Sequence, residues 1–261
     1  IDMKNDYNFI AYDENTVFNN FRKFVDINDK KILEVGGNMD ENIIFQYGVD
    51  EWISVDPKRS NFISNNKKYI CKKLPLLECK LNKDYFDIIF SSNAFEHITN
   101  FNQNLSYMYR VLRSGGYLFS QFGPIWSAPD GHHLEDVKLK NGEYLNFWEN
   151  NIIPNWYHLI CTKNELLIKL QELYDFNDAK RIVDYVYESE YLNRLFFKDY
   201  IKAFLDTGFQ IQFLSTSSCI DYKINAQLSN NISVQQSIDL LKNMYGNDDF
   251  KCRDITVLLK K

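Results

Sequence analysis

The stretch KILEVGGNMDENIIFQYGVDEWISVDP, residues 31–57, decides the fold. It begins with a short apolar run that ends at two glycines, which is typical of a buried strand. The segment 39–48 follows as a short helix that Gly48 terminates. A second apolar run, EWISV at 51–55, is then followed by Asp56 and Pro57. Strand, helix and strand in this order indicate two parallel strands joined by a helical crossover.

The same alternation continues as far as residue 123. We expect a leading helix at 14–25, because four of its apolar residues fall on one helical face. Further strands are expected at 67–74, 84–92 and 116–123, with a helix at 101–113 that Gly115 and Gly116 end. After residue 123 the alternation breaks, and it resumes with a helix at 196–209 and strands at 210–216 and 254–261. The chain is therefore predicted to be an α/β protein with a parallel sheet and helices on both faces.

The chain of 261 residues is expected to hold one sheet domain with an insertion. The sheet domain comprises residues 1–123 and 195–261, and residues 124–194 form a helical cap rich in aromatic residues after the fifth strand. We see no internal repeat and no low-complexity linker.

Composition excludes several classes of protein. The net charge of −5 argues against a nucleic-acid binder, which would carry a basic stripe. No apolar run approaches the ~20 residues that a membrane span needs, and the N-terminal residues lack the apolar core of a signal peptide. The cysteines form no CxxC pair, so reduced thiols in a cytoplasmic protein are expected. They are Cys71, Cys79, Cys161, Cys219 and Cys252.

Polar and glycine residues follow three of the predicted strands. In an open parallel sheet, ligands bind beyond the carboxyl ends of the strands, where the strand order reverses. Gly36 and Gly37 would let the backbone approach a ligand closely, and Asp56 stands where an acid can hold both hydroxyls of a ribose. Asp40 and Glu41 would repel a pyrophosphate. The pattern therefore favours a nucleoside with a cationic tail.

With ILEVGG (32–37), SVDP (54–57), FDIIFSSNAFEHI (86–98) and RVLRSGGYLF (110–119), the sequence resembles the class I S-adenosylmethionine-dependent methyltransferases. The resemblance implies a Rossmann-like sheet of seven mostly parallel strands, of which the last is antiparallel. It also implies S-adenosylmethionine as the cofactor and S-adenosylhomocysteine as the product. One departure is that the family usually has further glycines where this chain has Asn38 and Asp40.

The resemblance also implies a role for each matched position. Glu34 and Gly36 would lie against the methionine part of the cofactor, and Asp56 would accept both ribose hydroxyls. Pro57 with Lys58 would flank the adenine, and the backbone near Cys71 and Lys72 would meet the edge of the adenine. The full set of implied cofactor-binding residues is Glu34, Gly36, Gly37, Asn38, Asp56, Pro57, Cys71, Lys72, Ser92, Asn93 and His97.

The segment FGPIWSAPDGHHLED, 122–136, holds the candidate catalytic base. Imidazole, with an ordinary pKa of ~6.5, suits the deprotonation of a hydroxyl at neutral pH. We expect His133 to be the base, with His132 as the second choice. Two alternatives stay open. One is that both histidines form hydrogen bonds within the loop. The other is a divalent metal ion, although the spacing matches no metal motif; its candidate donors are His132, His133, His158, Asp130, Glu135 and Asp136. Trp126, Trp156 and His158 are predicted to bind the methyl acceptor.

The pattern GPIWS…GHH is similar to methyltransferases encoded among bacterial surface-polysaccharide enzymes. This resemblance implies O-methylation of a small acceptor, such as a nucleotide-linked sugar or another capsular polysaccharide precursor. One alternative is a catalytically inactive cofactor-binding protein, because the glycine motif is incomplete. A further alternative is an NAD-dependent oxidoreductase, against which the missing phosphate loop and the lack of a Tyr-x-x-x-Lys pair near the fifth strand argue.

Overall fold

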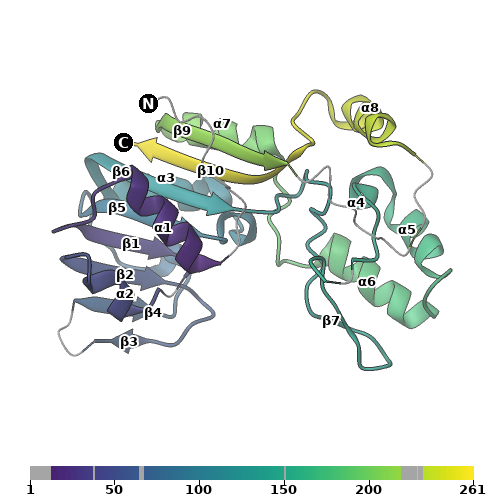
Figure 1. The fold of residues 1–261 in the computed structure, drawn as a ribbon, viewed down its shortest axis with the longest axis horizontal. Helices are drawn as coiled ribbons and strands as arrows, with labels where there is room; N and C mark the ends of the chain where they lie inside the picture. The colour runs from purple at the N-terminus through teal and green to yellow at the C-terminus, as the bar shows by residue number, and fades with distance from the viewer. Residues whose placement is uncertain (1–12, 38, 65–67, 150, 219–227, 229–231) are drawn as a thin grey trace. The chain divides into compact units, whose positions relative to one another are not determined.

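The computed structural model describes residues 13–37, 39–64, 68–149, 151–218, 228 and 232–261. The chain divides into two compact units (Figure 1). The sheet unit comprises Ile1–Gly123, Tyr200–Ser217 and Asp254–Lys261, and the helical unit comprises Pro124–Asp199 and Ser218–Arg253. The sequence analysis gave residues 195–199, 218, 228 and 232–253 to the sheet domain, whereas in the structure they are grouped with the helical unit.

An eight-stranded sheet in the order β3-β4-β2-β1-β5-β6-β10-β9 forms the centre of the sheet unit (Figure 1). The strands from β4 to β6 in this order are parallel to one another, and β10 is antiparallel to β6. The strands are β1 (Lys31–Val35), β2 (Glu51–Val55), β3 (Phe62–Ile63), β4 (Tyr69–Lys72), β5 (Phe86–Ser92), β6 (Leu112–Phe122), β9 (Gln210–Ser218) and β10 (Cys252–Lys260). The predicted mostly parallel sheet and its antiparallel last strand are confirmed.

The predicted number of seven strands is wrong. The additional strand, β3, pairs antiparallel with β4 at the edge of the sheet through two exposed residues, Phe62 and Ile63. A strand of two residues is too short to show an alternating pattern in the sequence. The helix expected at 101–113 also ends earlier, at Val111, because β6 begins at Leu112, which pairs with Phe86. The glycine at 115 (φ +77°) therefore lies inside β6 rather than at the helix end.

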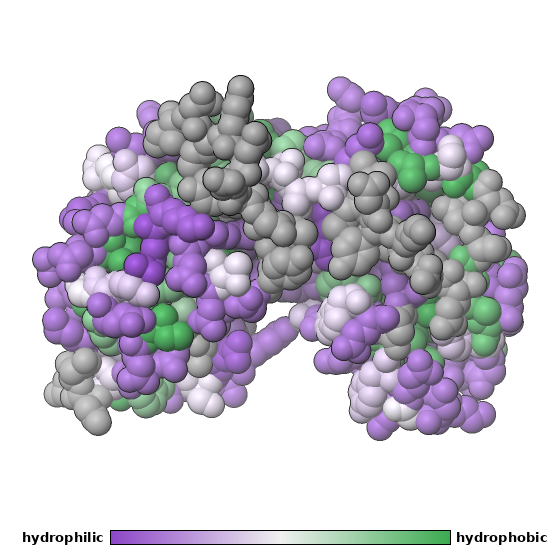
Figure 2. Space-filling view, in the orientation of Figure 1, coloured by the Kyte–Doolittle hydropathy of each residue, from purple (hydrophilic) through white to green (hydrophobic). Residues whose placement is uncertain are grey.

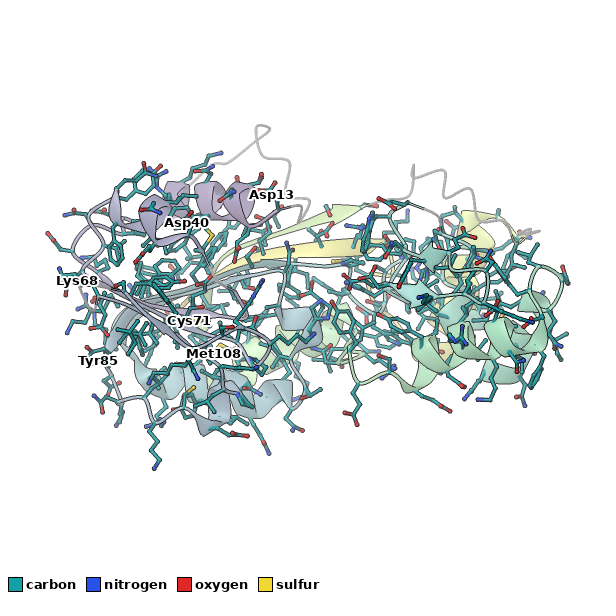
Figure 3. The ribbon with its side chains drawn as sticks, turned by 90° about the horizontal axis from the view of Figure 1, so that it is seen from below. Asp13, Asp40, Lys68, Cys71, Tyr85 and Met108 are labelled. Carbon is teal, nitrogen blue, oxygen red and sulfur yellow. The ribbon has the colours of Figure 1, made fainter. Side chains whose placement is uncertain are left out.

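Helices cover both faces of the sheet. On one face α1 (Glu14–Phe24) and α2 (Glu41–Phe45) pack on apolar residues of the sheet, and the Asn20 amide donates to Gln121 Oε1. Phe122, one position further along β6, points to the opposite face and packs on Tyr200 of α7 (Phe197–Thr207). Aromatic contacts join α3 (Phe101–Val111) to α7 on that face. Figure 3 shows the labelled Asp13 and Asp40, which cap α1 and α2, on the opposite side of the sheet from Met108 of α3.

The helical unit has an apolar core of its own, which includes Leu134, Ile152, Trp156 and Ile182. Its elements are α4 (Tyr157–Ile160), α5 (Lys163–Leu170), α6 (Phe176–Glu188), α8 (Val234–Tyr245), and the short pair β7 (Val137–Lys138) and β8 (Tyr144–Leu145). Capping boxes begin α5 and α8.

Hydrophilic residues predominate on the face of the chain shown in Figure 2. None of the helices in the described residues is long and apolar enough to cross a membrane.

Candidate functional site

The strand order reverses between β1 and β5, so the loops that follow these strands meet at one edge of the sheet. Gly36, the first residue after β1, has φ +78°, and a Cβ on it would stand 2.3 Å from the Cβ of Ala94 in the loop after β5. Its backbone N–H donates to the Val55 carbonyl at the end of β2. A side chain at position 36 is therefore excluded, and the loops after three neighbouring strands are fixed against one another.

Glu34 carries a fully buried carboxyl group beneath this loop. It accepts hydrogen bonds from the Met39 backbone N–H (3.1 Å) and from Trp52 Nε1 (2.8 Å). A Cβ on Gly37 would stand 2.3 Å from Glu34 Oε1 and 2.7 Å from Oε1 of Glu14, in the first turn of α1. Burial, and next the charge of Glu14, raise the pKa of Glu34 to about 8. Two carboxyl groups thus flank a glycine at the carboxyl end of β1, an arrangement that suits a cation.

This raised pKa predicts a pH dependence of stability. In the folded protein Glu34 keeps its proton to a pH near 8, whereas in the unfolded chain it loses it near 4.5. The folded state therefore binds more protons between these pH values, and the free energy of unfolding should fall as the pH rises through this window. The slope is at most about 1.4 kcal/mol per pH unit.

Urea unfolding at pH 5.5, 6.5 and 7.5 measures this slope. Glu34→Gln carries no titrating group at position 34, so its free energy of unfolding should depend less on pH than that of the wild type. Equal slopes for the two proteins would show that Glu34 is already ionised across this range.

Asp56 follows β2 and is 9% exposed. Its Oδ1 accepts from the Lys58 backbone N–H (2.7 Å), and Arg59 Nε lies 3.7 Å from its Oδ2. The loop that Asp56 begins lines a cavity of about 660 Å³. This cavity is lined by Met39, Asp40, Glu41, Lys58, Arg59, Ser60, Phe62 and Tyr69. Pro57 is exposed in this loop of the sheet unit. Lys72 lies in the same unit, at the end of β4. Burial raises the pKa of the Cys71 thiol, one position earlier in β4.

Ser92 ends β5, and its hydroxyl is buried without a hydrogen-bond partner in the described part of the chain. Phe90 pairs with Glu34 in the register of β1 and β5, so Ser92, two positions further on, faces the same side of the sheet as Glu34. Asn93 follows with φ +47°, and its N–H donates to the Gln121 carbonyl. Ser92 therefore has a buried hydroxyl that lacks a hydrogen-bond partner among the described residues, at the edge where a ligand is expected.

His97 lies in the turn after β5 and has a different set of contacts. Its Nε2 lies 3.8 Å from Oε1 of the buried Glu96, which in turn accepts from the Gly123 backbone N–H. This chain of contacts ties the turn after β5 to the end of β6. Asn38, which the sequence analysis also assigned to the cofactor, lies outside the described residues.

The structure thus brings most of the predicted cofactor residues to one edge of the sheet unit. The residue that sequence reasoning missed there is Glu14. Its position in the sequence shows only an acid in the first turn of a helix, which is common at helix N-termini. Only the packing of α1 on the sheet, which the tertiary fold decides, carries this carboxylate to Gly37.

His132 and His158 lie together in the core of the helical unit, with their rings 5.7 Å apart. The Leu134 N–H donates to His132 Nδ1, so the ring proton of His132 is on Nε2. His158 Nε2 lies 2.8 Å from the Trp126 carbonyl and donates to it. Burial lowers the pKa of each imidazole to about 3. Both rings are therefore neutral at physiological pH and weak as bases.

His133 occupies a different environment in the same loop. It has φ +48°, and its ring lies 4.6 Å from the ring of Phe147 and 5.9 Å from that of Tyr191. Its carbonyl accepts from the Tyr185 hydroxyl. Trp156 is fully buried, and its indole N–H donates to the Phe250 carbonyl. His132 and His133, although adjacent in the sequence, thus have different neighbours, and Trp156 lies in the core of this unit.

The alternative of a metal ion finds no support among the described residues, which contain no group of three or more His, Cys, Asp and Glu side chains able to hold one. Asp130, which could have supplied a ligand, forms a buried ion pair with Arg253 at 2.9 Å. The carboxylate of Asp130 therefore has a structural role in the helical unit.

Comparisons with known proteins agree with this geometry. Residues 45–120 match the family described as a methyltransferase domain. The solved structure of an S-adenosylmethionine-dependent methyltransferase from Mesorhizobium loti is similar, with a TM-score of 0.50 and 11% identity over 94% of this chain and 97% of that one. This chain has the fold of the S-adenosylmethionine-dependent methyltransferases. A putative methyltransferase of this kind from Listeria monocytogenes has a TM-score of 0.51 and 13% identity, over 94% of this chain and 97% of that one.

A search of curated proteins found no match. The predicted methyltransferase fold is confirmed by these structures, and the family match over residues 45–120 agrees with the prediction of S-adenosylmethionine as the cofactor. The residues at the carboxyl edge of the methyltransferase sheet fit this cofactor. Asp56 offers a carboxylate for a ribose diol, the carboxyl pair at Gly37 suits a cation, and the hydroxyl of Ser92 needs a partner.

Proposed function

We propose that this chain is an S-adenosylmethionine-dependent O-methyltransferase that acts on a small acceptor. A nucleotide-linked sugar or another capsular polysaccharide precursor is the proposed acceptor class. The observation that supports the methyl-transfer function is the carboxyl edge of the sheet unit, where Glu34 near the end of β1, Asp56 directly after β2 and Ser92 at the end of β5 lie on adjacent strands. The helical unit, with its own core and its loop at 124–136, is proposed to bind the acceptor.

The proposed roles at the sheet edge follow from the chemistry of each group. Asp56 accepts hydrogen bonds from the two ribose hydroxyls, while Glu34 and the glycine backbone hold the methionine end. Pro57 and Lys58 flank the adenine, with Cys71 and Lys72 at its edge. Ser92 and Asn93 line the floor under the sulfonium, with His97 behind them. When bound, the cofactor supplies an electrophilic methyl carbon next to a sulfonium, and the protein aligns the acceptor for in-line attack.

The proposed base is His133. A hydroxyl acceptor loses its proton as its oxygen attacks the methyl carbon, and S-adenosylhomocysteine leaves with the electron pair of the broken carbon–sulfur bond. His132 and His158 are poor choices for the proton acceptor because their pKa values lie near 3. For Trp126, Trp156 and His158 a direct role in acceptor binding remains a prediction.

An acceptor screen tests the function. The wild-type chain is mixed with S-adenosylmethionine and, one at a time, with nucleotide sugars and phosphate-containing sugar precursors, and each mixture is analysed by mass spectrometry. A gain of one methyl group on an acceptor, with an equal amount of S-adenosylhomocysteine, is the expected result. Cofactor binding without any methylated product across the panel would favour the inactive cofactor-binding protein instead.

A further inference from the structure

The first turn of α1 brings a second carboxyl group to the methionine end of the proposed cofactor site. Asp13 caps this helix by accepting from the Thr16 N–H, and Val17, Phe18 and Phe21 bury its apolar face in the core of the sheet unit. This packing fixes the position of Glu14, whose Oε1 lies 2.7 Å from the point where a Cβ of Gly37 would stand. Glu14 is therefore placed by a rigid element and not by a loop.

The two carboxyl groups at Gly37 differ in exposure. Glu34 is completely buried and holds the backbone N–H of Met39 and the indole of Trp52, whereas Glu14 is partly exposed. Glu14 is therefore the more accessible of the two carboxyl groups. A Cβ at position 37 would collide with both carboxyl groups, so a glycine is required for them to lie this close to the main chain.

The charge of Glu14 and Glu34 indicates which kind of ligand group these two side chains would bind. Two carboxyl groups so close together repel each other when both are ionised, and this repulsion contributes to the raised pKa of Glu34. A cation between them would remove the repulsion. The hydroxyl of Ser92, buried and without a partner in the described residues, faces the same side of the sheet one strand away and offers a further polar contact.

The cofactor carries two cationic groups, and their chemistry distinguishes them. A sulfonium has no N–H or O–H to donate, whereas an ammonium has three donors and can bridge two carboxylates with directed hydrogen bonds. The space at Gly37 follows β1, where the methionine end is proposed to lie. An ammonium is therefore the group that can donate to both carboxyl groups, and its positive charge would favour the ionised form of Glu34.

We propose that Glu14 of α1, together with Glu34, binds the ammonium group of the methionine part of the cofactor across Gly37. This inference rests on the proposed function, because it assumes that the cofactor occupies the edge of the sheet unit. It assigns to α1, which lies outside the matched family region of residues 45–120, a direct part in cofactor binding.

Calorimetric titration of the full chain tests this assignment with two probes. S-adenosylhomocysteine carries the ammonium, and 5′-methylthioadenosine keeps the adenosine and the thioether but lacks the amino-acid end. Glu14→Gln is expected to weaken binding of S-adenosylhomocysteine about 10-fold, because a hydrogen-bonded charge is lost. Binding of 5′-methylthioadenosine should be unchanged. Glu78→Gln, which removes an exposed acid elsewhere in the sheet unit, should bind both probes as the wild type does.

Each outcome of this experiment decides one point. Equal weakening of both probes by Glu14→Gln, or no weakening of S-adenosylhomocysteine, would overturn the role of Glu14. If the wild type binds neither probe, the proposed function fails as well, and this result is distinct from the first two. Thermal unfolding of the ligand-free variants checks their folding, and Glu14→Gln is expected to unfold no earlier than Glu78→Gln because it relieves repulsion at Glu34.

Discussion

Replacing His133 with alanine is expected to lower the rate of methyl transfer about 10²–10⁴-fold, the contribution of a general base. The affinity for S-adenosylmethionine should stay close to that of the wild type, because His133 belongs to the helical unit and the proposed cofactor residues belong to the sheet unit. Steady-state turnover with the acceptor found in the screen, together with calorimetry of the cofactor, measures both quantities on one preparation of the variant.

His132→Ala is the matched control for this prediction. It removes a neighbouring imidazole that is fully buried and has a pKa near 3. The loss of buried contacts should lower the temperature of unfolding, while the protein that remains folded should keep most of its turnover. Normal turnover in His133→Ala combined with a large loss in His132→Ala would move the base to His132. Normal turnover in both variants would show that solvent, and not either histidine, takes the proton of the acceptor hydroxyl.

Asp56→Ala is expected to weaken the binding of S-adenosylmethionine by about 1.5–3 kcal/mol, or roughly 10- to 150-fold. The carboxylate is nearly buried at the carboxyl end of β2, and the variant leaves the ribose hydroxyls without their charged acceptor. Calorimetry with S-adenosylhomocysteine gives the same comparison without turnover.

Two further variants separate binding from loop structure. Asp56→Asn keeps an oxygen for the Lys58 N–H and removes only the charge, so its affinity should lie between those of the wild type and Asp56→Ala. Asp50→Asn changes an exposed acid just before the other end of β2, next to Lys68, and should bind the cofactor normally. An unchanged affinity in Asp56→Ala would show that the ribose is held elsewhere.

The sheet and its binding edge could be predicted because their signals are local. The run at 31–37 ends at glycines where β1 ends, and the acid and proline at 56–57 follow β2, as the structure shows. Chain direction then places these ends at one edge, since parallel strands that share a sheet share their carboxyl side. The position of Gly36 against Ala94 gives the physical reason for the first glycine.

The features that the sequence could not predict depend on tertiary packing. Adjacent histidines in a polar loop look alike in the sequence, yet His132 is fully buried beside His158, whereas His133 lies against Phe147. Nothing in the sequence of residues 232–253 shows whether they pack on the sheet or on the inserted helices, and only their contacts assign them to the helical unit. Glu14 likewise becomes a site residue only through the packing of its helix.

Calorimetric titration of the wild-type chain with S-adenosylmethionine, and separately with NAD, tests the central claim most directly. The carboxyl pair at Gly37 and the acids at 40 and 41 favour a nucleoside with a cationic tail over a pyrophosphate. We therefore predict that S-adenosylmethionine binds with one site per chain and that NAD binds far more weakly. Tighter binding of NAD, or no binding of S-adenosylmethionine, would contradict the account.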